Sequence, residues 1–124
     1  MEISSYRDLK VWQSAIDLAE IVYSITADYP KSEIYGLTSQ TRRAAVSIAA
    51  NIAEGHGREK TAAFIQFLRV SQGSLKELET HLILAERFGF VAANQLAKPL
   101  GLCDELGRMT RGLIRSLQER QGES

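Results

Sequence analysis

The sequence predicts an all-α protein that folds as a single antiparallel up-and-down four-helix bundle over residues 1–124. Apolar residues recur at steps of three and four along four segments, which is the period of an amphipathic helix. Aliphatic residues and alanine are plentiful and aromatic residues make up 7%, a mixture that favours helices over strands. No stretch of useful length alternates with the period of two that a strand requires. Helices of similar length joined by short loops pack most economically antiparallel, at about 20° to one another.

The first helix is predicted over residues 6–27. Ser5 followed by Asp8 has the spacing of a capping box, with Asp in place of the usual Glu. Pro30 cannot continue the helix and disfavours the helical conformation of the residue before it. The seam expected to face inward consists of Leu9, Trp12, Ile16, Ala19, Tyr23 and Thr26.

A connector over residues 31–37 leads to the second helix. This helix is predicted to begin at Thr38 or Ser39, both suitable N-caps, and to end near Glu54, just before two glycines. Its apolar seam consists of Thr41, Ala45, Ile48 and Ile52. Small side chains that permit the close approach of another helix widen this face, namely Ala44, Ala49, Ala50 and Ala53.

The third helix is predicted over residues 61–87 and ends at Gly89. The fourth is predicted over residues 92–120, with Pro99 causing either a kink or a short separate helix in its first turns. The third seam consists of Phe64, Leu68, Ser71, Leu75, Leu78, Leu82 and Ala85. The fourth consists of Leu102, Leu106, Met109, Leu113 and Leu117.

Composition and charge narrow the classes of function. Fifteen basic residues balance fifteen acidic residues, which disfavours strong non-specific binding to nucleic acid but leaves local patches free to bind. The single cysteine, Cys103, cannot form an internal disulfide and lies in an apolar helical pattern. The longest uncharged stretches, such as residues 44–53, have about half of the ~20 residues that a membrane span needs. We therefore expect a cytoplasmic protein with no membrane partner.

Signatures of catalysis are weak, so an enzyme is not expected. The only histidines are His56 and His81, and no Glu and His occur at the i and i+3 spacing that di-iron bundles use. Cys103 is interpreted as a small core residue. Residues 55–58 follow a helix and lack the Gly-Lys-Ser/Thr ending of a phosphate loop, so they are interpreted as an interhelical turn. No metal, cofactor or small-molecule substrate is expected.

A polar stripe follows one face of the second helix, beside its apolar seam. The stripe consists of Arg43, Ser47, Asn51, Glu54 and Arg58, at steps of four, four, three and four. One interpretation is a binding surface in which the arginines contact phosphates. The favoured interpretation is a polar network that reaches Glu77 or Glu79 on the third helix, within one subunit or between subunits, because buried charges must be paired.

A second stripe, of arginines, lies late in the fourth helix and is a candidate nucleic-acid site. It consists of Arg108, Arg111 and Arg115, with Arg120 just beyond and Lys98 as an extension. Three guanidinium groups on one face are enough to meet a phosphate backbone. A solvated surface, together with the preference for cations near helix C-termini, explains the same pattern. No aromatic residues interleave with these arginines, so base stacking is not supported.

Two blocks of the sequence resemble a known bacterial family. One contains Arg42-Arg43-Ala44-Ala45 and the specific motif Asn51-Ile52-Ala53-Glu54-Gly55. The other is Gly73-Ser74-Leu75-Lys76-Glu77-Leu78-Glu79-Thr80, and Leu9-Lys10-Val11-Trp12 adds a third match. Together they resemble the four-helix-bundle family named after the protein encoded in 23S ribosomal RNA intervening sequences. Members typically open the third helix with Ser and Glu, where this chain has Lys60 and Ala63, so a capping pair is missing.

The resemblance implies an assembly and a partner. Members are similar to the accessory variability determinant of diversity-generating retroelements, a five-fold ring of four-helix bundles that engages a reverse transcriptase and its RNA. A homopentamer and a role with RNA or a ribonucleoprotein are therefore implied. Independently, a second apolar stripe predicts self-association, because a bundle buries one stripe per helix. On the first helix this stripe consists of Val11, Ile21, Val22 and Ile25.

The sequence thus predicts a non-enzymatic, homo-oligomeric helical bundle that binds RNA or a ribonucleoprotein. The alternative is a protein–protein adaptor or scaffold whose arginines only keep it soluble.

Overall fold

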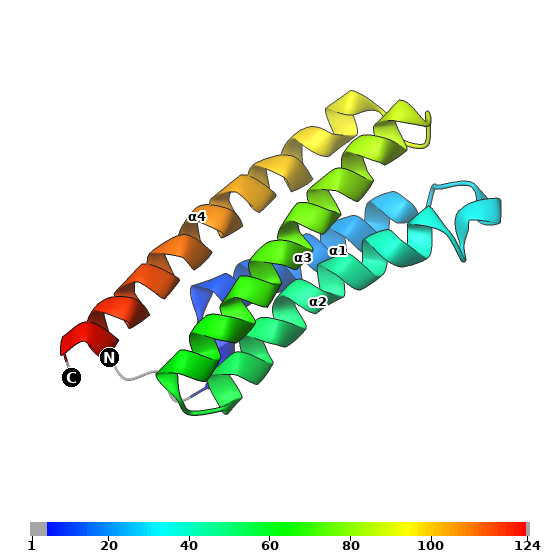
Figure 1. Cartoon of the computed structure of the whole chain (residues 1–124). Helices are drawn as coiled ribbons and strands as arrows, with labels where there is room; N and C mark the ends of the chain where they lie inside the picture. Colours follow the sequence, from blue (N-terminus) through cyan, green and yellow to red (C-terminus); the bar gives the residue numbers. More distant parts are fainter. Residues whose placement is uncertain (1–4, 124) are drawn as a thin grey trace.

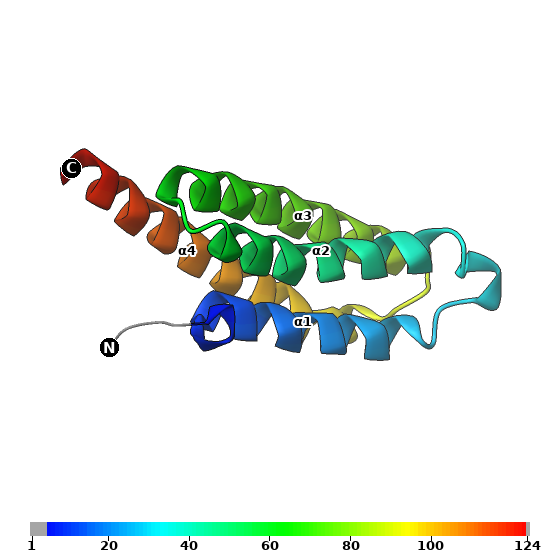
Figure 2. The same ribbon diagram turned by 90° about the horizontal axis from the view of Figure 1, so that it is seen from below.

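Four long helices lie lengthwise beside one another in the computed structural model, which describes residues 5–123 (Figure 1). They are α1 (Lys10–Thr26), α2 (Leu37–Gly57), α3 (Thr61–Arg87) and α4 (Ala93–Glu123). Each runs antiparallel to the next, as the view from below also shows (Figure 2). Helices α1 and α3 each pack on both α2 and α4. The described residues contain no strand, so the predicted all-α up-and-down bundle is confirmed.

The beginning of α1 differs from the prediction. The Ser5 hydroxyl accepts a hydrogen bond from the Arg7 backbone N–H at 3.1 Å, but the turn that it caps is a 3₁₀ turn, Tyr6–Asp8. Leu9 is extended, and the α-helix begins only at Lys10. The prediction of one continuous helix from residue 6 is therefore wrong in its first turn, because the extended backbone of Leu9 separates the 3₁₀ turn from the α-helix.

The inward seam of α1 is also shifted. The buried residues of α1 are Val11, Ala15, Leu18, Val22 and Thr26. Tyr23, which was predicted to face inward, is 45% exposed. The predicted seam therefore lies on one flank of the core-facing stripe, and two members of the supposed second stripe, Val11 and Val22, belong to the core. A broad apolar face makes several lines of residues look alike, and only the neighbouring helices determine which line is central.

Helix α2 begins at Leu37 and is capped by a residue that precedes it in the connector. The Glu33 carboxylate accepts a hydrogen bond from the Leu37 backbone N–H at 3.1 Å. Glu33 ends a 3₁₀ turn, Lys31–Glu33, which follows Pro30. Neither of the predicted N-caps, Thr38 and Ser39, has that role, because both lie inside the helix. The carboxylate satisfies one of the free amide groups and complements the positive end of the helix dipole.

The end of α2 lies one turn beyond the prediction, at Gly57. Gly55 does not end the helix but lets α3 approach, since a Cβ placed there would lie 2.5 Å from the Cβ of Phe67. The reversal into α3 takes place at residues 58–60, where Glu59 has a positive φ of 64°. Lys60 precedes α3 without a side-chain cap, as its departure from the family pattern predicts.

Helices α2 and α3 are the most closely associated pair in the bundle. Small and hydroxyl side chains line their contact. The Ser71 hydroxyl donates to the backbone carbonyl of Ile48 at 2.9 Å, and the hydroxyls of Ser47 and Ser74 lie 2.8 Å apart. The predicted seams of both helices are buried, apart from the half-buried Phe64. The alanines of α2 thus serve contacts within the subunit: Ala44 and Ala49 are buried, and only Ala50 is fully on the surface.

Helix α4 is continuous through Pro99, so a separate short helix does not form. Pro99 is buried in the second turn, where its missing N–H costs only the bond to the carbonyl of Gln95. The α3–α4 turn contains Gly89 with φ of +81°, a conformation that favours glycine. Buried residues of α4 are Leu96, Pro99, Cys103, Leu106, Gly107, Thr110, Ile114 and Leu117. Three predicted seam residues are only half-buried: Leu102, Met109 and Leu113.

Candidate functional site

The polar stripe of α2 divides into two parts in the structure. In its middle, the amide of Asn51 donates to the hydroxyl of Ser47 at 3.0 Å and to its backbone carbonyl at 2.8 Å. Ser47 in turn bonds Ser74 on α3. These side chains are part-buried and join the two helices inside one subunit. This part of the stripe therefore has the structural role that the sequence favoured.

The charged part of the stripe does not reach α3 in the predicted way. Arg58 pairs with Glu54 on its own helix at 2.9 Å, with both side chains more than half exposed, and stacks over the ring of Phe67 at 5.2 Å. Glu77 instead bonds His81, and Glu79 pairs with Lys76, all on α3. The prediction of a network that reaches Glu77 or Glu79 within the subunit is therefore wrong, because each carboxylate contacts a partner about one turn away on α3 itself.

Arg43 is the one member of the stripe that is exposed and has no ion pair among residues 5–123. It lines a shallow hollow of about 350 Å³ beside α1, together with Tyr23, Ile34 and Val46. The neighbouring Arg42 is anchored, since its Nε donates to the Thr26 hydroxyl at 2.8 Å and its guanidinium lies 4.5 Å from the centre of the Tyr23 ring. The sequence reasoning missed Arg42, although its position beside Arg43 in the motif was visible.

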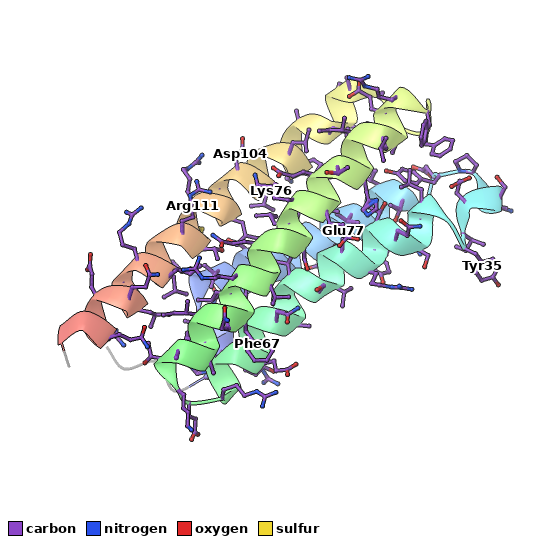
Figure 3. The ribbon with its side chains drawn as sticks, in the orientation of Figure 1. Tyr35, Phe67, Lys76, Glu77, Asp104 and Arg111 are labelled. Carbon is purple, nitrogen blue, oxygen red and sulfur yellow. The ribbon has the colours of Figure 1, made fainter. Side chains whose placement is uncertain are left out.

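The arginines of α4 point away from the core. Arg108, Arg111 and Arg115 are all exposed, and the ion pairs of the described residues do not involve them. Figure 3 shows Arg111 on α4, with Lys76 on the neighbouring part of α3. At 100° per residue, Asp104 and Glu119 share this outward face, so the stripe is of mixed charge.

Arg120 does not extend this stripe. Five residues after Arg115, it lies about 140° further around the helix. It instead lines a pocket of about 440 Å³ at the end of the bundle where α2 turns into α3. Lys98, three turns before the stripe, is exposed as well. The structure thus brings together three of the four predicted arginines and separates the fourth.

The pocket that Arg120 lines was not foreseen from the sequence. Its walls come from Leu9, just before α1, from the α2–α3 turn and the residues beside it, and from the last turns of α4. The other lining residues are Leu9, Gly55, His56, Glu59, Lys60, Thr61, Phe64, Leu113 and Leu117. His56 stands edge-on to Phe64, with 5.7 Å between ring centres and 85° between ring planes. No local sequence motif indicates this pocket, because the residues near the α2–α3 turn and the residues of α4 that line it are some 60 residues apart in the sequence.

His81 is a buried titratable group on α3. Its Nε2 lies 3.3 Å from a carboxylate oxygen of Glu77, whereas its Nδ1 is buried without a hydrogen-bond partner among the described residues. Burial lowers the pKa of His81 below its ordinary value of 6.5, and the carboxylate of Glu77 opposes this shift. Burial therefore favours the neutral form of the His81 imidazole.

Cys103 is 1% exposed in the core of α4. Burial, followed by the negative charges of Glu79 and Asp104, raises the pKa of its thiol to about 12. A nucleophilic cysteine needs the opposite shift. The sequence-based interpretation of Cys103 as a core residue agrees with its burial.

No group of three or more His, Cys, Asp or Glu side chains among residues 5–123 is arranged to hold a metal ion. No helix there is long and apolar enough to cross a membrane.

The fold and these surfaces define a small antiparallel helical bundle with an arginine-bearing outward face on α4. Residues 7–112 match the family described as 23S rRNA-intervening sequence protein, and because the match spans most of the chain, the chain belongs to that family. It is similar in structure to a protein of unknown function from the S23 ribosomal protein family of Bacteroides thetaiotaomicron VPI-5482. The TM-score is 0.75 at 21% sequence identity, over 84% of this chain and 97% of that chain, a likeness that shows the fold alone. No curated protein matches the chain.

Proposed function

We propose that the protein is a non-enzymatic, cytoplasmic, homo-oligomeric module that binds RNA or a ribonucleoprotein through the outward face of α4. The observation that carries the proposal is the row of three exposed arginines, Arg108, Arg111 and Arg115, without ion-pair partners among residues 5–123. Guanidinium groups that are not already paired are available to phosphates, and each contact releases counterions. Membership of a family named for a ribosomal RNA intervening sequence is consistent with such a partner.

A salt titration of RNA binding tests this role. The double variant Arg111→Ala, Arg115→Ala is expected to bind structured RNA more weakly and with a salt dependence that is shallower by about one for each lost phosphate contact. The matched control is Arg69→Ala, Arg87→Ala, which removes two exposed arginines from α3 and leaves the stripe intact. Identical affinities for the two double variants would contradict the proposal.

The proposed assembly is a ring-like homopentamer, by likeness to the accessory variability determinant. Exposed apolar side chains on the outer face of α2 and α3 support self-association. Val46 is 46% exposed and Val70 is 52% exposed, and Ala50, one turn after Val46 on α2, is exposed as well. Ala50 follows Ser47 by three residues and Val70 precedes Ser74 by four, so in this antiparallel pair both lie about one turn to the same side of the Ser47–Ser74 contact. A second subunit that covers this face contacts both helices.

Light scattering coupled to size-exclusion chromatography tests the assembly. The wild type is expected to elute as a pentamer, and the variant Val46→Asp, Val70→Asp as a monomer with an unchanged helical circular dichroism spectrum. The control Ser116→Asp, Gln118→Asp places the same charges on exposed polar positions of α4, away from the α2–α3 face, and is expected to remain a pentamer. A wild-type monomer at micromolar concentration would contradict the proposal.

A protein–protein adaptor is the second candidate, and two exposed aromatic side chains favour it. Tyr35 is 95% exposed on the α1–α2 connector and projects away from the bundle (Figure 3), and Phe88 is 59% exposed at the end of α3. Aromatic residues are enriched at protein interfaces. In addition, Asp104 and Glu119 reduce the net charge of the arginine face. Absence of RNA binding at low salt would favour the adaptor.

A further inference from the structure

The pocket at the α2–α3 turn has the size and lining of a small-molecule site. Its volume of about 440 Å³ falls within the usual range of roughly 300–1,000 Å³ for ligand pockets. Apolar side chains contribute part of the wall: Phe64 from α3, and Leu113 and Leu117 from α4. Three separate segments of the chain converge on it, so it forms only in the folded bundle.

Two of the five polar side chains that line the pocket are cationic. Lys60, just before α3, and Arg120, on α4, both line it, and Glu59 supplies the single carboxylate. Neither cation has an ion-pair partner among the described residues. Two unpaired cations beside one acid favour a ligand with an anionic group, and a phosphate can accept from both at once.

The aromatic groups of the pocket favour a flat ligand. The rings of His56 and Phe64 meet edge to face at one wall, with centres 5.7 Å apart. Such a wall can contact a third ring through a stacked or a perpendicular arrangement. An aromatic wall close to two cations matches a molecule that has a planar ring at one end and a phosphate at the other.

We propose that this pocket binds a nucleoside monophosphate, either free or as the 5′-phosphorylated end of RNA, with the base against Phe64 and the phosphate held by Lys60 and Arg120. The site is distinct from the outward face of α4, because Arg120 lies about 140° around the helix from Arg115. Three of its lining residues, Leu113, Leu117 and Arg120, lie beyond the residues 7–112 that match the family.

Nuclear magnetic resonance titration of the whole protein with AMP, adenosine and inorganic phosphate tests the site. AMP is expected to give saturable shifts at the amides of Thr61 and Leu117, and adenosine and phosphate, which each lack one half of the ligand, are expected to bind at least about tenfold more weakly. The variant Lys60→Gln, Arg120→Gln is expected to weaken AMP binding at least about tenfold, whereas Arg108→Gln, Arg115→Gln leaves it unchanged. Phe64→Leu keeps an apolar side chain but is expected to remove the preference for AMP over phosphate.

The outcomes separate this proposal from the RNA-binding proposal. Absence of saturable AMP shifts at these amides, or equal losses in the two arginine-containing variants, would overturn the pocket assignment even if RNA binds the α4 face. A tetranucleotide with a 5′-phosphate that binds more tightly than AMP, and more tightly than the same tetranucleotide with a 5′-hydroxyl, identifies an RNA end as the occupant. AMP binding that equals or exceeds that of the phosphorylated tetranucleotide identifies a free nucleotide. Both of these last results support the pocket.

Discussion

Gly55 of α2 and Phe67 of α3 approach so closely that a Cβ on the glycine would lie 2.5 Å from the Cβ of the phenylalanine. The same atom would also lie 3.1 Å from Cδ1 of Phe64. The Cβ of Phe67 is fixed to its backbone, so it cannot move aside unless α3 moves. This contact therefore determines the separation of the two helices near the turn that joins them.

Gly55→Ala is expected to destabilise the protein, although alanine is normally the better helix former by about 1 kcal/mol. Overpacking of this kind costs about 1–3 kcal/mol, which exceeds the gain in helix propensity. Thermal unfolding followed by circular dichroism measures the difference. The control is Gly112→Ala in α4, where an added Cβ meets nothing within 4 Å and should stabilise the helix. A Gly55→Ala variant at least as stable as the wild type would show that α3 can move away freely.

The hydroxyls of Ser47 and Ser74, 2.8 Å apart, are expected to be energetically coupled across the α2–α3 contact. Each single Ser→Ala change leaves the other part-buried hydroxyl without this partner, so the two free energies of unfolding should not add. A double-mutant cycle in urea should give a coupling energy of about 0.5–1.5 kcal/mol. The control cycle pairs Ser47 with Thr80, whose hydroxyl donates to the Lys76 carbonyl on its own helix. A coupling near zero for Ser47 and Ser74 contradicts the prediction.

Stability is expected to fall as the pH falls below about 6.5, because of His81. Burial lowers its pKa in the folded protein below the ordinary value of 6.5, so in the interval between the two the unfolded chain binds more protons. The free energy of unfolding therefore decreases with acidification through this interval. Melting temperatures at pH 7.5 and 5.5 measure the effect, which should be smaller in His81→Gln.

Glu77→Gln provides the complementary variant. Its carboxylate opposes the lowering of the His81 pKa, so its removal should enlarge the loss of stability between the two pH values. If His81→Gln loses as much stability on acidification as the wild type does, the pH dependence originates elsewhere in the chain.

Cys103 is expected to resist thiol reagents in the folded protein. Its thiol is 1% exposed and has a pKa of about 12, against an ordinary value of 9.0, so the reactive thiolate at pH 8 is about a thousandfold scarcer. A colorimetric thiol assay with Ellman's reagent should show slow labelling under native conditions and complete labelling in guanidinium chloride. Asp104→Asn removes one of the charges that raise the pKa and should leave the thiol buried and slow. Rapid native labelling would mean that the core around Cys103 opens frequently.

Much of the candidate functional surface was predictable from the spacing of residues along single helices. Arg108, Arg111 and Arg115 share a face because steps of three and four return to the same side of any helix. The interpretation of Ser47 and Asn51 as structural agrees with their observed bonds. The predicted contact between the stripe and the carboxylates of α3 was wrong. Glu77 and Glu79 instead contact His81 and Lys76 on their own helix. Competition between nearby and distant partners depends on side-chain geometry that spacing does not contain.

The sequence by itself determined four amphipathic helices and most of their ends, because helical periodicity, prolines and glycines act over one or two turns. Tertiary structure decided which of several adjacent apolar lines in α1 and α4 became the core, since the position of two neighbouring helices selects that line. It also turned Gly55 from a helix terminator into a packing position. Only the folded bundle could place Lys60 and Arg120 around one pocket, because residues so far apart along the chain meet through the packing of whole helices.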